Sequence, residues 1–188
     1  MMHDISQRKK TQMCLDMQYA VSHCLINSAN ITNATRGAID IICNSMNFGY
    51  GKIWALDKKE QVLRYLSSWS DGKDTDKTTE KIYSSVVMNH DDGLPGKVVT
   101  TGLPLWIEDL SKESSTYYPK DFKYITAIVV PIKNEKELVG VMEFVSSNKI
   151  VNDDIIMQAL QSVGEQIGSF LKHKQFENYQ KIQMKQGR

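Results

Sequence analysis

The position of its prolines constrains this chain more than any other sequence feature. All four prolines of the 188 residues lie in the middle of the chain, at positions 95, 104, 119 and 131. Proline lacks a backbone N–H and clashes with the preceding turn, so it breaks helix interiors. The two proline-free flanks can therefore form long helices, and we expect helices at both ends of the fold.

The N-terminal flank predicts two helices. Apolar residues recur at steps of three and four over residues 8–28, which places them on one stripe: Met13, Met17, Val21, Cys24 and Leu25. After a break at residues 30–33, a second helix is expected to about Met46, and Gly49 suits the left-handed position beyond its end. Residues 1–10 are expected to be disordered or to start the first helix.

The centre of the chain changes to the period of strands. Aromatic and β-branched residues indicate strands at 50–56, 62–69, 105–107, 126–132 and 138–146. Brief helices are expected at 97–101 and around residues 82–87, and residues 111–124 read as irregular. Antiparallel hairpins framed by terminal helices predict an α+β fold, with the helices packed on one sheet face and the proline-containing middle covering the other.

The C-terminal flank predicts the longest helix, from Asp153 to about Gln186. Its apolar residues form a seam resembling that of a coiled coil, Ile156, Leu160, Val163, Ile167 and Phe170. One helix cannot bury this seam and its apolar neighbours against one sheet, so we expect partner helices, including a second copy of the chain. The spacing Gly164-x-x-x-Gly168 would allow close helix approach. Residues 176–188 are expected to be a helix extension or a linker to an output domain.

Charge and composition exclude several classes of function. The net charge of +1 argues against nucleic-acid binding by bulk electrostatics. The longest apolar run is far shorter than a membrane helix, and the N-terminus lacks the apolar segment of a signal peptide, so we expect no direct membrane contact. Three cysteines without C-x-x-C spacing indicate reduced thiols in a cytoplasmic protein, as small buried apolar residues.

Five blocks in register resemble the GAF domain over roughly residues 15–175. They are Ile42-Cys43 with Phe48 to Trp54, Asp57 and Trp69; Gly93 to Val98; Thr101 to Asp109; Pro131-Ile132 with Glu137 to Phe144; and Val163 to Phe170. The pattern is most similar to the subtype found in bacterial hybrid histidine kinases and cyclic-di-GMP signalling proteins. The resemblance implies one domain over residues 11–175 with a sheet of five to six strands. It also implies helices from both termini that form a dimer bundle, and a small-ligand pocket on the other sheet face.

The resemblance also suggests which residues line that pocket. They are Trp54, Trp69, Leu94, Pro95, Val98, Trp106, Tyr117, Tyr118, Phe122 and Ile128. Aromatic side chains offer apolar area with a polar tip, which suits a small organic ligand. Trp54 and Trp106 could instead belong to the sheet core, whereas Tyr117 and Tyr118 lie in a polar segment and suit a covering loop.

Candidate catalytic groups are sparse. No Ser/His/Asp or Cys/His set is evident, and His90 has no second metal ligand at matching spacing. Within the family, methionine sulfoxide reduction and bilin attachment need cysteines in later segments, and none follows Cys43. The cyclic-nucleotide pattern is incomplete at Asn148-Lys149 and Asp153-Asp154. We therefore expect no catalytic residues, no enzyme activity, no metal and no cofactor.

These observations predict a regulatory sensor domain of a bacterial signalling protein. It would bind an unknown small molecule and signal through a homodimeric helical bundle to a histidine kinase or diguanylate cyclase type of output domain. Two alternatives stay open, a ligand-free dimerisation or docking module and a small stand-alone enzyme on the same fold.

Overall fold

The protein is built around one antiparallel sheet. The computed structural model describes residues 2–73, 87–113 and 123–187. Its six strands are β1 (Tyr50–Asp57), β2 (Val62–Ser70), β3 (Val87–Asn89), β4 (Leu105–Ile107), β5 (Thr126–Asn134) and β6 (Glu137–Ser146). They lie in the order β3-β2-β1-β6-β5-β4, and every neighbouring pair is antiparallel. The predicted sheet of five to six strands is confirmed.

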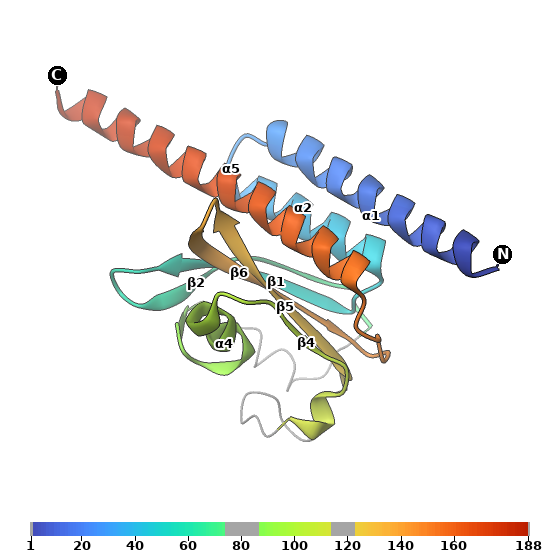
Figure 1. Ribbon diagram of the computed structural model, residues 1–188. Coiled ribbons are helices and arrows are strands. Elements are labelled where there is room, and N and C mark those ends of the chain that lie inside the picture. The colour runs from blue at the N-terminus through green and yellow to red at the C-terminus, as the bar shows by residue number, and fades with distance from the viewer. Residues whose placement is uncertain (1, 74–86, 114–122, 188) are drawn as a thin grey trace.

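The helices divide unequally between the two faces of the sheet. Figure 1 shows α1 (Met2–Ile26), α2 (Ile31–Met46) and α5 (Asp154–Gln186) together on one side, which we call the helix face. The other side carries α4 (Gly93–Thr101), and we call it the α4 face. A single 3-10 turn, η1 (Leu110–Lys112), follows β4. The predicted α+β layering is confirmed, with helices from both termini on one face.

Apolar periodicity in the terminal helices fills the core of the helix face. Ile39 and Ile42 of α2 are fully buried there, as are Leu160, Val163 and Ile167 of α5. Burial of one such side chain stabilises a fold by about 1.5–3 kcal/mol. Most of the seam predicted as a dimer contact therefore packs on the sheet of its own chain. Ile156 and Phe170, at its two ends, are only partly buried.

Two glycines let α5 lie directly on β5. A Cβ atom added at Gly164 would come within 2.6 Å of the Pro131 carbonyl oxygen, and one at Gly168 within 2.1 Å of the Lys133 carbonyl oxygen. Both distances are too short for any side chain, so glycine is required at each. The sequence suggested that this pair lets helices approach one another. In the structure it lets a helix approach a strand.

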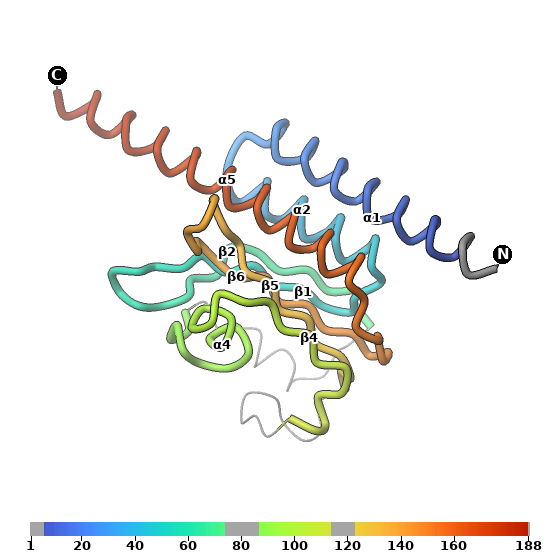
Figure 2. Tube along the Cα trace, in the orientation of Figure 1, coloured from blue at the N-terminus to red at the C-terminus, as the bar shows by residue number. Residues whose placement is uncertain are grey.

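The last turns of α5 leave the body of the domain. Figures 1 and 2 show this end of the helix running on beyond the sheet. Large apolar side chains are exposed along it, including Phe176, Tyr179 and Ile182. Among the described residues, no helix combines the length and apolar character needed to cross a membrane. The short helix expected around residues 82–87 falls outside the described residues except for Val87, which begins β3.

Candidate functional site

The α4 face holds a second, smaller apolar core. Trp54 of β1 is fully buried in it, together with Leu94 and Val98 of α4. Pro95 is also buried, in the first turn of the same helix. Helix α4 is capped by Gly102, whose φ of 68° is in the left-handed region that glycine adopts readily. Four of the predicted pocket residues therefore meet on the α4 face.

Three predicted pocket residues lie on the opposite side of the sheet. Trp69 and Trp106 pack against the helix-face core, and Ile128 is buried within it. The Trp106 indole Nε1 donates a hydrogen bond to the Ile150 carbonyl oxygen at 3.0 Å. Residues that lie directly opposite each other on two neighbouring strands point to the same face of the sheet. Trp106 and Ile128 are such a pair on β4 and β5, and both lie on the helix face. The other three, Tyr117, Tyr118 and Phe122, lie outside the described residues.

Two charged side chains that we did not predict are fully buried on the α4 face. Lys52 of β1 and Glu143 of β6 lie directly opposite each other in the sheet register. The Lys52 Nζ atom is 4.0 Å from the centroid of the Trp54 ring and 5.2 Å from that of the Tyr65 ring. Such cation–π contacts stabilise a desolvated ammonium group. The aromatic residues thus help to hold a charge inside the protein.

Burial also changes how this ammonium group titrates. Removal from water lowers the pKa of Lys52 from 10.5 to about 8, although the nearby Glu143 charge acts in the opposite direction. Burial likewise raises the pKa of the Tyr50 hydroxyl, two residues earlier on the same strand face. The α4 face therefore presents ionisable groups in a low-dielectric setting, which is a common property of binding and catalytic sites.

The indole of Trp54 adds an unpaired donor to this group. Its Nε1 atom is buried and has no hydrogen-bond partner. Leaving a buried donor unpaired costs about 1–3 kcal/mol. An acceptor within hydrogen-bond distance of this Nε1 atom would remove the cost.

A polar cavity opens at the end of the sheet where β1 begins and β6 ends. It has a volume of about 170 Å³ and is lined by Asn47, Gly49, Asp71, Lys73, Lys123, Tyr124, Ser147 and Asn148. Tyr124 belongs to both the cavity wall and the core of the α4 face. Two larger hollows, of about 480 Å³ along α1 and about 390 Å³ beside the β1–β2 hairpin, β6 and α5, are not lined by Lys52 or Glu143. Neither Lys52 nor Glu143 lines the cavity, which meets the core of the α4 face through Tyr124. We take the cavity and the buried pair together as the candidate site.

The cysteines lie away from this site. Cys14 and Cys43 are buried in the helix-face core, and burial raises the pKa of both thiols. Cys24 is only partly buried, on α1. The prediction of small buried apolar cysteines is therefore confirmed for two of the three.

The described residues group no set of metal ligands. The Nε2 atom of His90 lies 3.4 Å from the Oε1 atom of Gln61. Within residues 2–73, 87–113 and 123–187, no three His, Cys, Asp or Glu residues are grouped so as to hold a metal ion.

Solved structures share this architecture at low sequence identity. The GAF domain of an Acinetobacter phosphoenolpyruvate-protein phosphotransferase is 18% identical, with a TM-score of 0.71 over 85% of this chain and 92% of its own. A putative GAF sensor protein from Burkholderia vietnamiensis is 12% identical, with a TM-score of 0.70 over 88% and 97%. The free methionine-R-sulfoxide reductase of Neisseria meningitidis, solved with its substrate, is 10% identical, with a TM-score of 0.74 over 89% and 93%. At these identities the likeness shows the fold alone.

The expectation that this chain is not an enzyme needs correction. Besides the Neisseria protein, free methionine-R-sulfoxide reductases of Staphylococcus aureus and Thermoplasma acidophilum share the fold, with TM-scores of 0.67 and 0.61. The same architecture thus carries catalysis in several similar structures. The sparse histidines and cysteines of the sequence are not sufficient to exclude an enzyme.

Sequence comparison identifies the family. No curated protein matches this chain. A family model described as GAF domain matches residues 28–172, a span that begins just before α2 and ends within α5. It includes the whole sheet, the core of the α4 face, the buried Lys52–Glu143 pair and the residues around the polar cavity. The chain therefore belongs to the GAF domain family.

Proposed function

We propose that this chain is a regulatory sensor module that binds a small polar molecule on the α4 face of its sheet. The observation that carries the proposal is the buried pair of Lys52 and Glu143 beside the unpaired indole N–H of Trp54. Burying two charges has a desolvation cost that their mutual attraction does not always repay. A site for a polar ligand gives such a pair a use, since a few placed polar groups in an apolar wall provide orientation and specificity.

The signal would leave through the terminal helices. In this proposal, two copies pair through α1 and α5, and the exposed end of α5 carries the change onward to an output domain. The output would be of the histidine kinase or diguanylate cyclase type, in a cytoplasmic bacterial two-component or cyclic-di-GMP pathway. Support comes from the exposed Phe176, Tyr179 and Ile182 on α5 and from the likeness to a putative GAF sensor protein.

Native mass spectrometry of freshly purified protein tests the ligand part directly, because it reports bound mass and oligomer together. We expect extra mass on the wild-type protein that is lost in Lys52→Met. The matched control is Lys9→Met, which changes an exposed lysine on α1 and should keep the bound mass. If no mass is bound and no metabolite in a thermal-shift panel raises the melting temperature, the sensor proposal fails and a ligand-free docking module is favoured.

A second candidate is favoured by the likeness to the free methionine-R-sulfoxide reductases. In this case the chain would reduce a small sulfoxide, with two thiols of an added dithiol becoming a disulfide and the oxygen leaving as water. Incubation with free methionine-R-sulfoxide and a dithiol, followed by measurement of methionine, tests it. Formation of methionine above the protein-free rate would replace the sensor proposal by an enzymatic one.

A further inference from the structure

A short segment connects the polar cavity with the helix layer. Residues 147–153 link β6 to α5, and we call them the β6–α5 connection. At one end, Ser147 and Asn148 form part of the cavity wall. At the other end, Asp153 caps α5, its Oδ1 atom accepting hydrogen bonds from the backbone N–H groups of Ile155 and Ile156. One segment of seven residues therefore takes part in both structures.

The Thr126 hydroxyl joins three segments of the chain inside the protein. Thr126 begins β5 and is 1% exposed. Its Oγ1 atom lies within donor distance of the carbonyl oxygens of Glu108 and Asn148, at 3.1 and 3.0 Å, and accepts a hydrogen bond from the Ile150 N–H at 2.9 Å. A single side chain thus fixes the β6–α5 connection to β5 and to the segment that follows β4.

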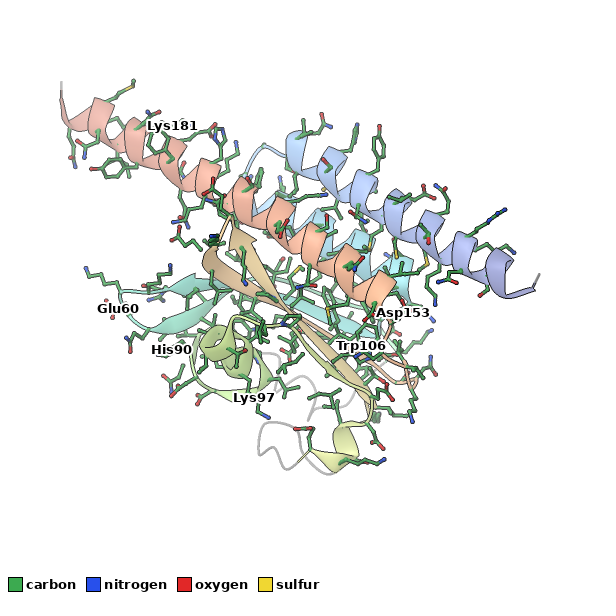
Figure 3. The ribbon with its side chains drawn as sticks, viewed as in Figure 1. Glu60, His90, Lys97, Trp106, Asp153 and Lys181 are labelled. Atoms are coloured by element: carbon green, nitrogen blue, oxygen red, sulfur yellow. The ribbon has the colours of Figure 1, made fainter. Side chains whose placement is uncertain are left out.

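Two further hydrogen bonds hold the connection against β4 and the residue after it. The Trp106 indole donates to the Ile150 carbonyl oxygen, and the Glu108 Oε1 atom accepts from the Asn152 N–H at 3.0 Å. Figure 3 shows Trp106 on β4 and Asp153 at the start of α5 at the same end of the molecule. Together with the hydrogen bonds to Thr126, these bonds hold the backbone of every second residue of the connection, at Asn148, Ile150 and Asn152.

Asp153 continues the chain of contacts to α1. While its Oδ1 atom caps α5, its Oδ2 atom forms an ion pair with Lys10 Nζ of α1. Both groups are partly withdrawn from water, with side-chain exposures of 22% for Asp153 and 35% for Lys10. One turn after Lys10, Cys14 is 3% exposed in the core. A displacement of Asp153 would therefore change both the start of α5 and the position of α1.

We propose that the β6–α5 connection transmits the state of the polar cavity to the contact between α5 and α1, with Thr126 and Glu108 as its positioning residues. This inference rests on the proposed sensor function, because it assigns the route by which that site is regulated. A ligand touching Ser147 or Asn148 shifts the backbone that Thr126 holds, and Asp153 follows. By reciprocity, loss of the Lys10–Asp153 pair loosens the cavity wall.

The test needs no ligand and uses the full chain. Thr126→Val keeps the shape of the side chain and removes the hydroxyl. The matched control is Thr35→Val, since Thr35 is fully buried and its hydroxyl donates within its own helix to the Ile31 carbonyl oxygen. Labelling with N-ethylmaleimide and peptide mapping by mass spectrometry measures each thiol separately. We expect Cys14 to react on the order of tenfold faster in Thr126→Val, since several hydrogen bonds are lost, with Cys43 unchanged.

Glu108 gives a second variant that leaves the core intact. Glu108→Ala removes the acceptor for the Asn152 N–H, and Glu108→Gln keeps an oxygen at that position. We expect faster amide hydrogen exchange over residues 152–158 and faster Cys14 labelling in Glu108→Ala, with rescue in Glu108→Gln. In the reverse direction, Lys10→Met should speed exchange over residues 147–150, whereas Lys9→Met should not.

Two results would overturn the inference. One is faster exchange confined to residues 147–150 in Thr126→Val and Glu108→Ala, with α5 and Cys14 as in the wild type. The other is a parallel rise at Cys14 and Cys43, which would show general loosening of the helix layer. Either result leaves ligand binding on the α4 face intact, and a protein that binds no ligand can still pass this test. The two proposals therefore fail separately.

Discussion

Lys52 and Glu143 lie directly opposite each other on β1 and β6, and neither side chain is exposed to solvent. Isolated buried charges are expensive, and the Glu143 charge favours the protonated form of Lys52. Lys52 also lies over the Trp54 ring. The pair is therefore the electrostatic centre of the α4 face, and it leads to two separate measurements.

The first prediction concerns the pH dependence of stability. The pKa of Lys52 is about 8 in the folded protein, against 10.5 ordinarily. Below pH 8 the Lys52 side chain is protonated in both the folded and the unfolded states. Between pH 8 and 10.5 only the unfolded state keeps the proton, so the free energy of unfolding rises with pH, by at most ~1.4 kcal/mol per pH unit. Lys52→Met should lack this rise.

Urea unfolding at pH 7.5, 8.5 and 9.5 checks the first prediction. The wild-type protein should gain stability relative to Lys52→Met as the pH increases. The control variant Lys9→Met should follow the wild-type curve, because Lys9 is exposed on α1 and the substitution leaves Lys52 buried as before. Parallel curves for wild type and Lys52→Met would show that Lys52 titrates as an ordinary lysine.

The second prediction is a strong coupling between the two buried charges. Removal of one partner of a buried ion pair typically costs about 3–5 kcal/mol, because the other charge stays without compensation. Lys52→Met and Glu143→Leu should each be destabilising in this range. The double variant should be close to the wild type, since replacement of a buried pair by apolar residues is often neutral. A double-mutant cycle by urea unfolding at pH 7 measures this coupling, and simple addition of the two single effects would contradict it.

The layering of the fold could be predicted from the sequence because it depends on local patterns. Proline placement and the three-to-four spacing of apolar residues located the terminal helices. Aromatic and β-branched residues located the strands of both hairpins. Each of these patterns is contained within one segment of the chain, so no knowledge of distant contacts was needed.

The candidate site depended on distant contacts and was predicted only in part. Trp106 and Ile128 were assigned to the pocket because their segments border it, but sheet register places both on the helix face. Lys52 was missed, although a signal for it was present in the sequence. It lies two residues before Trp54 on the largely apolar strand β1, and residues two apart on a strand point to the same face. The polar cavity joins residues around positions 47, 71, 123 and 147, which only the fold brings together.

The third prediction concerns the glycines beneath α5. Gly168→Ala places a Cβ atom against the Lys133 carbonyl oxygen of β5, so the helix or the strand must move. We expect a loss of at least about 1–3 kcal/mol, the usual cost of overpacking. In the control variant Gly187→Ala, the nearest atom would be 3.5 Å away and the φ of −84° suits alanine. That variant should change stability by less than about 0.5 kcal/mol. Thermal and urea unfolding measure both, and equal stabilities would show that α5 does not lie tightly on β5.

The fourth prediction concerns self-association through α5. Phe176 and Tyr179 are 60% and 62% exposed on the part of the helix that leaves the domain body. Apolar side chains held out in this way suit a partner helix, and we expect the wild-type protein to form a dimer. The double variant Phe176→Glu with Tyr179→Glu should be monomeric, with an unchanged free energy of unfolding for the body, since neither side chain belongs to its core. Leu103→Glu, at a 64% exposed position beyond α4, should remain dimeric. Light scattering coupled to size-exclusion chromatography decides the matter. A wild-type monomer at high concentration would refute pairing through the helices, and a dimer that survives both α5 substitutions would place the interface elsewhere.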